Sequence, residues 1–218
     1  MAGASITARR FGALRRAMPP AYVTLAGLVA GALLLAALFA PQIAPTNPLD
    51  LRSFNLADSE IPPLWVEGGD ARFLLGTDNQ GRDMLSAILY GARVSIMIGG
   101  GAVFLAAAIG VSLGLLAGYL GGRTDAVIMR IGDVILSFPT ILLALLVAGL
   151  ARAVTPEAAN PRYVPFVLIG AIAIHEWVQY ARTVRAATMV EGAREYVKAA
   201  RVIGLPSARI MFRHILPN

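Results

Sequence analysis

The chain has 218 residues and a net charge of +6, but 57% of its residues are hydrophobic and only 15% are charged. Together with a mean hydropathy of +0.67, this composition excludes an ordinary soluble globular domain and indicates an integral membrane protein. Cysteine is absent, which excludes a disulfide framework, a thiolate metal cluster and a cysteine nucleophile. The compartment therefore has to be argued from the distribution of charge along the chain.

The first predicted element is a membrane span at residues 22–40, a run of 19 residues without a charge. Such a run is long enough to cross a hydrocarbon layer of ~30 Å as a helix. The preceding residues 1–21 contain no acidic residue and four arginines, Arg9, Arg10, Arg15 and Arg16. By the positive-inside rule this segment is expected to be cytoplasmic. A cleaved signal peptide is the alternative, because an arginine-rich start and an apolar core partly imitate one.

Residues 41–93 form a polar interval that is predicted to be a periplasmic loop. Seven acidic residues and three arginines occur between Pro41 and Ala92, a balance that suits the outer side of the membrane. Gly76 and Gly81 are expected to break the chain before apolar residues recur at helical spacing from Met84. This pattern predicts a short helix lying at the outer face of the membrane.

A second span is predicted at residues 94–118, inside a run of 29 uncharged residues that implies tilt or an interfacial turn. Glycine recurs every four residues in this span, at Gly110, Gly114 and Gly118. Small residues at this spacing let a neighbouring helix approach closely, so we expect these glycines to serve helix packing. Lining of a pore is the alternative role.

A cytoplasmic loop at residues 119–127 is predicted to lead to a third span at residues 128–150. Asp133 lies near the inner end of this span, where it can pair with Arg130 one helical turn away. Pro139 is expected to bend the helix, because it removes an amide donor and clashes with the preceding turn. The candidate residues of a translocation path are Ser137, Phe138 and Pro139.

A second periplasmic loop at residues 151–162 is predicted to precede a fourth span at residues 163–180. His175 and Glu176 interrupt this span near its inner end. The stretch "HEWVQ" begins like the H-E-x-x-H motif of zinc proteases, but Gln179 stands where the second histidine ligand is needed. We therefore predict no metal site and expect an interfacial polar turn at this point.

Residues 181–218 are predicted to be a cytoplasmic loop, since two acidic residues accompany seven basic ones, Arg182, Arg185, Arg194, Lys198, Arg201, Arg209 and Arg213. Apolar and charged residues alternate with helical periodicity from Met189 to Ile203. Gly204 can end this amphipathic helix in the left-handed conformation, and Ser207 can cap a second short helix. Such an element can lie on anionic lipid or dock in a groove of a partner protein.

This last segment resembles the cytoplasmic loop signature of permease subunits in binding-protein-dependent ABC importers, E-A-A, three residues, G, nine residues, I-x-L-P. The matching positions are Lys198, Ala199, Ala200, Gly204, His214, Leu216 and Pro217. Lys198 replaces the acidic residue of the signature and His214 replaces the isoleucine. Three further stretches are similar to the dipeptide and oligopeptide branch, and to the second of its two permease subunits: "GTDNQGRDMLSAILYGARVSI", "MRIGDVILSFPTILLAL" and "WVQYARTVR".

The resemblance implies an all-α, polytopic membrane protein with the type I ABC importer permease fold, located in the bacterial inner membrane with a cytoplasmic N-terminus. In that family the loop couples the permease to an ATPase, which assigns this role to Tyr196, Ala199, Ala200, Arg201, Gly204, His214, Leu216 and Pro217. The implied partners are a second permease subunit in a heterodimer, two cytoplasmic ABC ATPase subunits, an external substrate-binding protein and membrane lipid. Nucleic acid is not among them.

No phosphate-cradling G-x-x-x-x-G-K-[ST] motif occurs in the sequence. We therefore expect that this chain is not an enzyme and binds no cofactor, and that ATP and magnesium are bound by the partner ATPase. Members of the family usually have six spans, whereas about four are predicted here. The chain is accordingly expected to be truncated at its C-terminus.

The expected function is ATP-driven import of di- or oligopeptides, with this chain forming half of the translocation path. Related permeases carry nickel or glutathione, and no residue of the sequence selects among these substrates. Two functions of other classes are also considered. One is a membrane scaffold whose basic tail binds anionic lipid, and the other is a secondary transporter driven by protons through Asp133 and Glu176.

Overall fold

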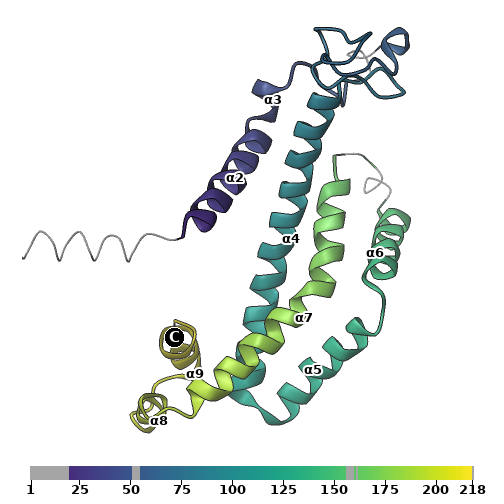
Figure 1. The fold of residues 1–218 in the computed structure, drawn as a ribbon. Coiled ribbons are helices and arrows are strands. Elements are labelled where there is room, and N and C mark those ends of the chain that lie inside the picture. The colour runs from purple at the N-terminus through teal and green to yellow at the C-terminus, as the bar shows by residue number, and fades with distance from the viewer. Residues whose placement is uncertain (1–19, 51–54, 156–159, 161, 218) are drawn as a thin grey trace, which may run out of the picture. The chain divides into compact units, whose positions relative to one another are not determined.

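The computed structural model describes residues 20–50, 55–155, 160 and 162–217 (Figure 1). Regular structure within these ranges is helical, apart from one isolated antiparallel bridge between Thr77 and Asp83. The expected all-α fold class is therefore confirmed for the described residues. The chain forms two compact units, Met1–Ile96 and Met97–Asn218, and each unit is described by itself.

The first unit begins with the apolar helix α2 (Ala21–Leu38) and the short helix α3 (Ala40–Ile43). The helix is interrupted at Phe39, because Pro41 lacks an amide hydrogen and its ring would clash with the carbonyl group of Ala37. α2 coincides with most of the span predicted at residues 22–40. The four arginines on which the cytoplasmic N-terminus was predicted lie outside the described residues.

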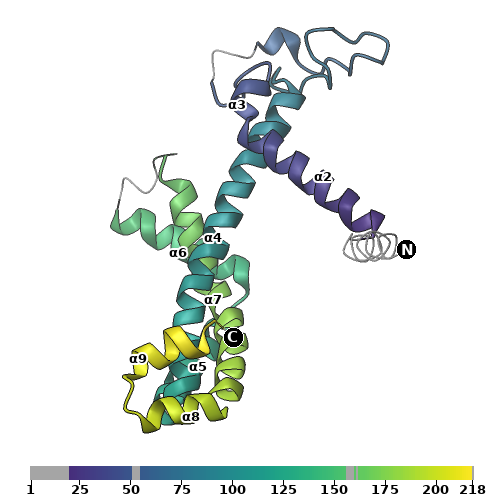
Figure 2. The same ribbon diagram turned by 90° about the vertical axis from the view of Figure 1, so that its left-hand side faces the viewer.

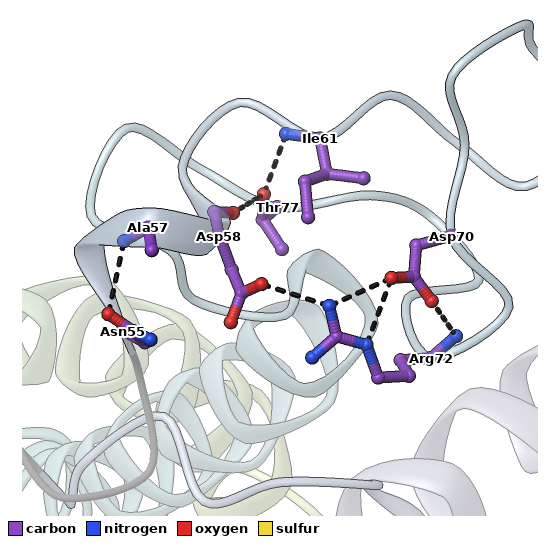
Figure 3. Close-up of polar contacts among 7 residues, drawn as sticks. All are labelled: Asn55, Ala57, Asp58, Ile61, Asp70, Arg72 and Thr77. Atoms are coloured by element: carbon purple, nitrogen blue, oxygen red, sulfur yellow. Dashed lines mark hydrogen bonds and ion pairs between the residues drawn. The ribbon is translucent and has the colours of Figure 1, made fainter.

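An irregular segment at residues 55–83 follows and contains one turn of 3-10 helix, η1 (Leu56–Asp58). Figure 3 shows that the Thr77 hydroxyl accepts a hydrogen bond from the Ile61 amide at 2.9 Å and donates one to the Asp58 carbonyl. These bonds join the two ends of the segment. Gly76 and Gly81 have φ angles of +77° and +74°, which confirms the breaks predicted at these two glycines.

Arg72 holds the middle of the same segment together. Its guanidinium donates hydrogen bonds to Asp58 and to Asp70 (Figure 3), each at 2.9 Å. It also lies 5.1 Å from the centre of the Phe73 ring. Hydrogen bonds from the side chain and backbone of Arg72 hold the pKa of the Asp70 carboxyl below its usual value. The segment thus has a defined conformation although it contains almost no regular structure.

Helix α4 (Met84–Leu120) is 37 residues long and begins where the Asp83 carboxylate accepts a hydrogen bond from the Ser86 amide at 2.9 Å. The short interfacial helix and the span predicted at residues 94–118 are one continuous helix, so the prediction of a separate helix is wrong. The reason is that residues 84–120 contain no proline, and glycines alone do not stop a helix. At about 1.5 Å per residue, α4 is about 55 Å long.

The second unit contains the remainder of α4 and the helices that follow it. Gly121 and Gly122 have φ angles of +62° and +53°, and helix α5 (Gly122–Leu136) begins at the second of them. The region predicted as a loop at residues 119–127 is therefore mostly helical. Two adjacent glycines can redirect the chain within a single break, since they adopt positive φ without steric cost.

Helices α5 and α6 (Thr140–Val154) meet at an angle of 95° across residues 137–139 (Figure 1). The bend predicted at Pro139 is thus present, and it divides the span predicted at residues 128–150 into two separate helices. Pro139 cannot donate an amide hydrogen, and its ψ of 131° places it outside the helical region.

Helix α7 (Val164–Gly192) is 29 residues long and continues twelve residues beyond the predicted end of the fourth span. It passes through His175 and Glu176 without interruption, so the predicted polar turn at these two residues is absent. A buried cluster joins α7 to α4, and its members are Ala106, Ala173, Trp177, Val178 and Ala181. The small alanine side chains in this cluster bring the two helices close together.

The chain ends in α8 (Glu195–Val202), α9 (Ser207–Ile210) and the π-helical turn η3 (Met211–Ile215), beside the C-terminal end of α7 (Figure 2). The amphipathic helix predicted from Met189 to Ile203 is divided, because α7 stops at Gly192 and Arg194 is extended. The predicted Ser207 cap is not formed. Pro206 occupies the N-cap position of α9, with no hydrogen bond from a side chain.

Three of the described helices, α2, α4 and α7, are long and apolar enough to cross a membrane, and the bent pair α5 and α6 makes a fourth candidate span. This number agrees with the prediction of about four spans.

Candidate functional site

We call residues 195–217, which comprise α8, α9 and η3, the two-helix element. Gly204 separates its two parts with a φ of +80°, as predicted. The Gly204 amide donates to the Arg201 carbonyl at 3.0 Å and the Leu205 amide donates to the Ala200 carbonyl at 3.1 Å. This is the Schellman pattern, which requires a left-handed residue after the helix. A Cβ at Gly204 would meet no other atom of the chain within 4 Å, so its requirement for glycine is conformational.

The inner face of the two-helix element is packed against the end of α4. Leu115 of α4 forms one buried cluster with Val197, Ala200, Ile210, Met211 and Ile215. Ala200 is only 4% exposed. Its small size therefore serves packing inside this chain, and it is not on the surface that a partner can reach.

The outer face of the element carries the remaining predicted coupling residues. Tyr196, Ala199, Arg201, Gly204, Leu216 and Pro217 are exposed, and His214 is half-buried. Large apolar side chains that the sequence reasoning did not select are exposed beside them, namely Val202, Ile203 and Phe212. An apolar surface on an otherwise charged element is typical of a site that another protein covers.

Polar contacts fix the element to its neighbours. The Tyr196 hydroxyl donates a hydrogen bond to Glu191 of α7 at 2.7 Å and lies 3.2 Å from the His214 carbonyl oxygen. The Arg201 guanidinium lies 4.8 Å from the centre of the Tyr119 ring, which belongs to α4. Two of the predicted coupling residues, Tyr196 and Arg201, thus also connect the element to α7 and α4.

The three glycines predicted to pack helices lie where α4 meets α7. A Cβ at Gly110 would be 2.6 Å from the Tyr180 Cβ, and one at Gly118 would be 2.7 Å from the Thr188 Cβ. A Cβ at Gly114 would be 3.0 Å from the Ala181 Cα. At these positions there is no room for even a methyl group. The two helices that support the two-helix element are therefore in backbone contact.

Two ion pairs connect α5 to α7. Arg185 binds the two carboxyl oxygens of Asp125 through Nε and Nη2, with an Nη2 to Oδ2 distance of 2.6 Å. Arg182 binds Asp133 at 2.7 Å. The predicted partner of Asp133 is Arg130, three positions earlier on the same helix. The tertiary partner replaces it because α5 lies along α7, which sequence spacing alone does not reveal.

The predicted path residues Ser137, Phe138 and Pro139 form the break between α5 and α6. The Ser137 hydroxyl donates to the Val134 carbonyl at 2.6 Å, and the Phe138 side chain is exposed. Directly after the break, the Thr140 hydroxyl lies 3.2 Å from His175 Nε2. The sequence pattern does not indicate this contact.

The same histidine continues a chain of polar contacts. His175 Nδ1 lies 3.2 Å from Glu176 Oε1, so Thr140, His175 and Glu176 form one polar cluster between α6 and α7. In the sequence, this cluster is indicated by the polar pair of His175 and Glu176 within an apolar span, together with the helix break at Pro139. Within the described residues, no group of three or more histidine, aspartate or glutamate side chains is placed to hold a metal ion.

Comparison with known proteins gives a consistent result. Residues 110–218 match the family described as binding-protein-dependent transport system inner membrane component. The chain is 43% identical over 183 residues to the di/tripeptide transport system permease protein of Pseudomonas aeruginosa, covering 84% of this chain and 56% of that protein. It is 41% identical over 184 residues to the dipeptide transport system permease protein of Haemophilus influenzae, with coverage of 84% and 58%.

A third relative is the oligopeptide transport system permease protein of Bacillus subtilis, which is 36% identical over 186 residues, covering 85% of this chain and 55% of that protein. The chain spans a little more than half the length of these curated relatives. The family match includes the last part of α4, the whole of α5, α6 and α7, and the two-helix element.

Proposed function

We propose that this chain is a permease subunit of an ATP-driven importer for di- or oligopeptides. The starting point is that the chain belongs to the family of inner membrane components of binding-protein-dependent transport systems. The substrate class follows from the names of the relatives, which are permeases for dipeptides, tripeptides or oligopeptides. In this proposal the chain contributes half of the translocation path. It performs no chemistry of its own.

The observation that carries the proposal is the construction of the two-helix element. Its inner face is buried against Leu115 of α4, whereas Ile203 and Phe212 are 74% and 59% exposed on its outer surface. When a partner bound to this outer surface moves, it also displaces α4 and α7. These two helices move together because their glycine contacts are too close to allow one helix to shift against the other. This is the mechanical requirement for coupling a separate ATPase to a membrane path.

The proposed topology follows from the distribution of charge. Residues 1–21, 119–127 and 181–218 are cytoplasmic, and residues 41–93 and 151–162 are periplasmic. The strongest support is the last segment, which combines basic residues with an exposed apolar surface. A positively charged segment of this kind is retained on the cytoplasmic side.

The proposed partners follow from the same family membership. A second permease subunit completes the path as a heterodimer, two cytoplasmic ABC ATPases bind ATP and magnesium, and an external binding protein delivers the substrate. Because the two-helix element is exposed, we assign the ATPase contact to its outer residues Tyr196, Ala199, Arg201, Gly204, His214, Leu216 and Pro217. Ala200 supports this surface from within.

The test is co-purification of this chain with its cognate ATPase subunits after expression of the complete transport system. Ile203→Glu places a charge on the proposed docking surface and should remove most of the ATPase from the purified complex. Leu56→Glu is the matched control, because Leu56 is also 74% exposed but lies in the irregular segment assigned to the periplasm. Equal ATPase retention by the two variants would contradict the proposal.

A further inference from the structure

One face of α7 is polar although the helix is a candidate membrane span. Glu176, Gln179 and Thr183 follow each other at spacings of three and four residues and so share one face. Gln179 and Thr183 are exposed in this chain, and 43% of the Glu176 side chain is exposed. The opposite face carries Ala173, Trp177 and Ala181, which are buried in the contact with α4.

The depth of Glu176 makes this face unsuitable for lipid. Glu176 lies twelve residues after Val164, which is about 18 Å along a helix, and six residues before Arg182, which is about 9 Å. A hydrocarbon layer of ~30 Å that ends near Arg182 therefore includes the Glu176 carboxyl. A carboxylate at this depth is costly against lipid, and such residues face a protein interior or a water-filled path.

The contacts of Glu176 orient it and leave part of it available. His175 Nδ1 lies 3.2 Å from one carboxyl oxygen, Oε1, and His175 Nε2 is held by the Thr140 hydroxyl at 3.2 Å. The His175 side chain is only 13% exposed, so its position is determined by packing. Arg182, the next cation along α7, is engaged by Asp133. The second carboxyl oxygen, Oε2, can thus accept hydrogen bonds from a group that enters from outside this chain.

We propose that Glu176 binds the positively charged amino end of the peptide during its passage, and that Gln179 and Thr183 continue the same polar face toward the cytoplasm. This inference rests on the proposed function as a peptide permease. An ammonium group supplies three N–H donors and a positive charge. A carboxylate at this depth requires both, because it must be hydrogen-bonded and its negative charge must be compensated. The Gln179 amide can both donate to and accept from the peptide backbone.

The break between α5 and α6 gives this site its position. Thr140 reaches His175 because α6 begins anew after Pro139, at 95° to α5. The predicted path residues Ser137, Phe138 and Pro139 and the polar face of α7 therefore belong to one region of the second unit. His175 and Thr140 act as positioning residues for the Glu176 carboxyl.

The first experiment measures binding without transport. The complete complex in detergent, free of nucleotide, is treated with dicyclohexylcarbodiimide, which modifies carboxyl groups in apolar surroundings, and modification of Glu176 is followed by mass spectrometry. We expect trialanine to protect Glu176 and N-acetyl-trialanine to give no protection. Equal protection by both peptides, or by neither, overturns the assignment of the amino end to Glu176.

The second experiment measures transport in proteoliposomes that contain the complete system and its binding protein. Uptake of radiolabelled trialanine per ATP hydrolysed should fall about tenfold or more for Glu176→Gln, the usual effect of losing a charged hydrogen bond, and fall less for Glu176→Asp. Glu67→Gln is the control, because Glu67 is an exposed carboxylate in the irregular segment, and its uptake should match the wild type.

These outcomes separate the inference from the proposed function. If the wild type shows no ATP-driven uptake of trialanine, the proposed function fails, whatever the labelling result. If the wild type transports and Glu176→Gln transports equally well, only the inference fails. If Glu176→Gln prevents assembly with the second permease subunit, Glu176 is an interface residue and the inference is overturned.

Discussion

The two sides of α7 hold their neighbouring helices by different means. Toward α4, Gly114 brings backbone against backbone, and a Cβ at this glycine would lie 3.0 Å from the Ala181 Cα. Toward α5 and α6, the connections are made by side chains. Val178 packs against Gly132 and its apolar neighbours on α5, and two ion pairs and the contact between Thr140 and His175 add polar connections. Steric contact permits one arrangement of two helices, whereas polar side chains can exchange partners.

This difference assigns a role to each side. The closely packed helices α4 and α7 cannot slide past each other without steric clashes. Together with the two-helix element they can therefore transmit a displacement. The α5 and α6 side carries the polar cluster and the helix break. Several connections there are polar and partly exposed, which suits one wall of the proposed peptide path.

Gly114→Ala should destabilise the second unit more than the loss of either ion pair between α5 and α7. The added Cβ must displace the backbone of α7 near Ala181, which should destabilise the chain by about 1–3 kcal/mol. The thermal unfolding midpoint of the detergent-purified protein should fall accordingly. Gly99→Ala is the control on the same helix, because its Cβ would meet nothing within 4 Å and alanine favours helix by up to about 1 kcal/mol. Similar midpoints for the two variants would refute backbone contact.

The ion pairs on the other side should contribute less. Asp125→Asn should cost about 1 kcal/mol, since Asp125 and Arg185 are 19% and 32% exposed and bind through two hydrogen bonds. Asp133→Asn should cost about 0.5 kcal/mol or less, because Asp133 and Arg182 are 53% and 46% exposed. Double-mutant cycles with Arg185→Met and Arg182→Met measure the two coupling energies. A larger coupling for the Asp133 pair would reverse the expected order.

The exposed pair of Asp70 and Arg72 in the irregular segment should have the smallest effect, and it should depend on pH. Its hydrogen bonds lower the pKa of Asp70 in the folded state. The stabilisation is therefore complete above the unfolded pKa of ~3.9 and is lost as pH falls through the lower folded value. The midpoint difference between wild type and Asp70→Asn, measured from neutral to acidic pH, should shrink toward low pH. A difference that grows on acidification would contradict this sign.

Features that depend on the local backbone could be predicted from the sequence. Gly204 has the positive φ that ends α8, and Pro139 marks the break before α6. Glycine readily adopts a positive φ and proline cannot continue a helix, so neither prediction needs knowledge of the neighbouring helices. The glycine repeat of α4 likewise indicated close packing, but the sequence did not identify α7 as the helix it contacts.

Features that depend on tertiary contacts were missed. The partner of Asp133 is Arg182, which lies 49 residues away, and Ala200 is buried rather than exposed. The polar pair of His175 and Glu176 is a pattern that indicates the end of a span, because charged residues are common at the membrane–water interface. The helix instead continues, since the surrounding alanines pack on α4 and Thr140 supplies a polar partner. Polarity alone could not distinguish an interface from a polar face inside a span.

Labelling of single cysteines shows whether the two-helix element lies in the cytoplasm and contacts the ATPase, because the chain contains no cysteine of its own. Ser59 and Ser207 are both exposed, and each is replaced by cysteine in turn and treated with a membrane-impermeant maleimide. Ser59→Cys should react in intact cells. Ser207→Cys should react only after permeabilisation, and less when the ATPase subunits are co-expressed. Labelling of Ser207→Cys in intact cells, or labelling unaffected by the ATPase, would contradict the account.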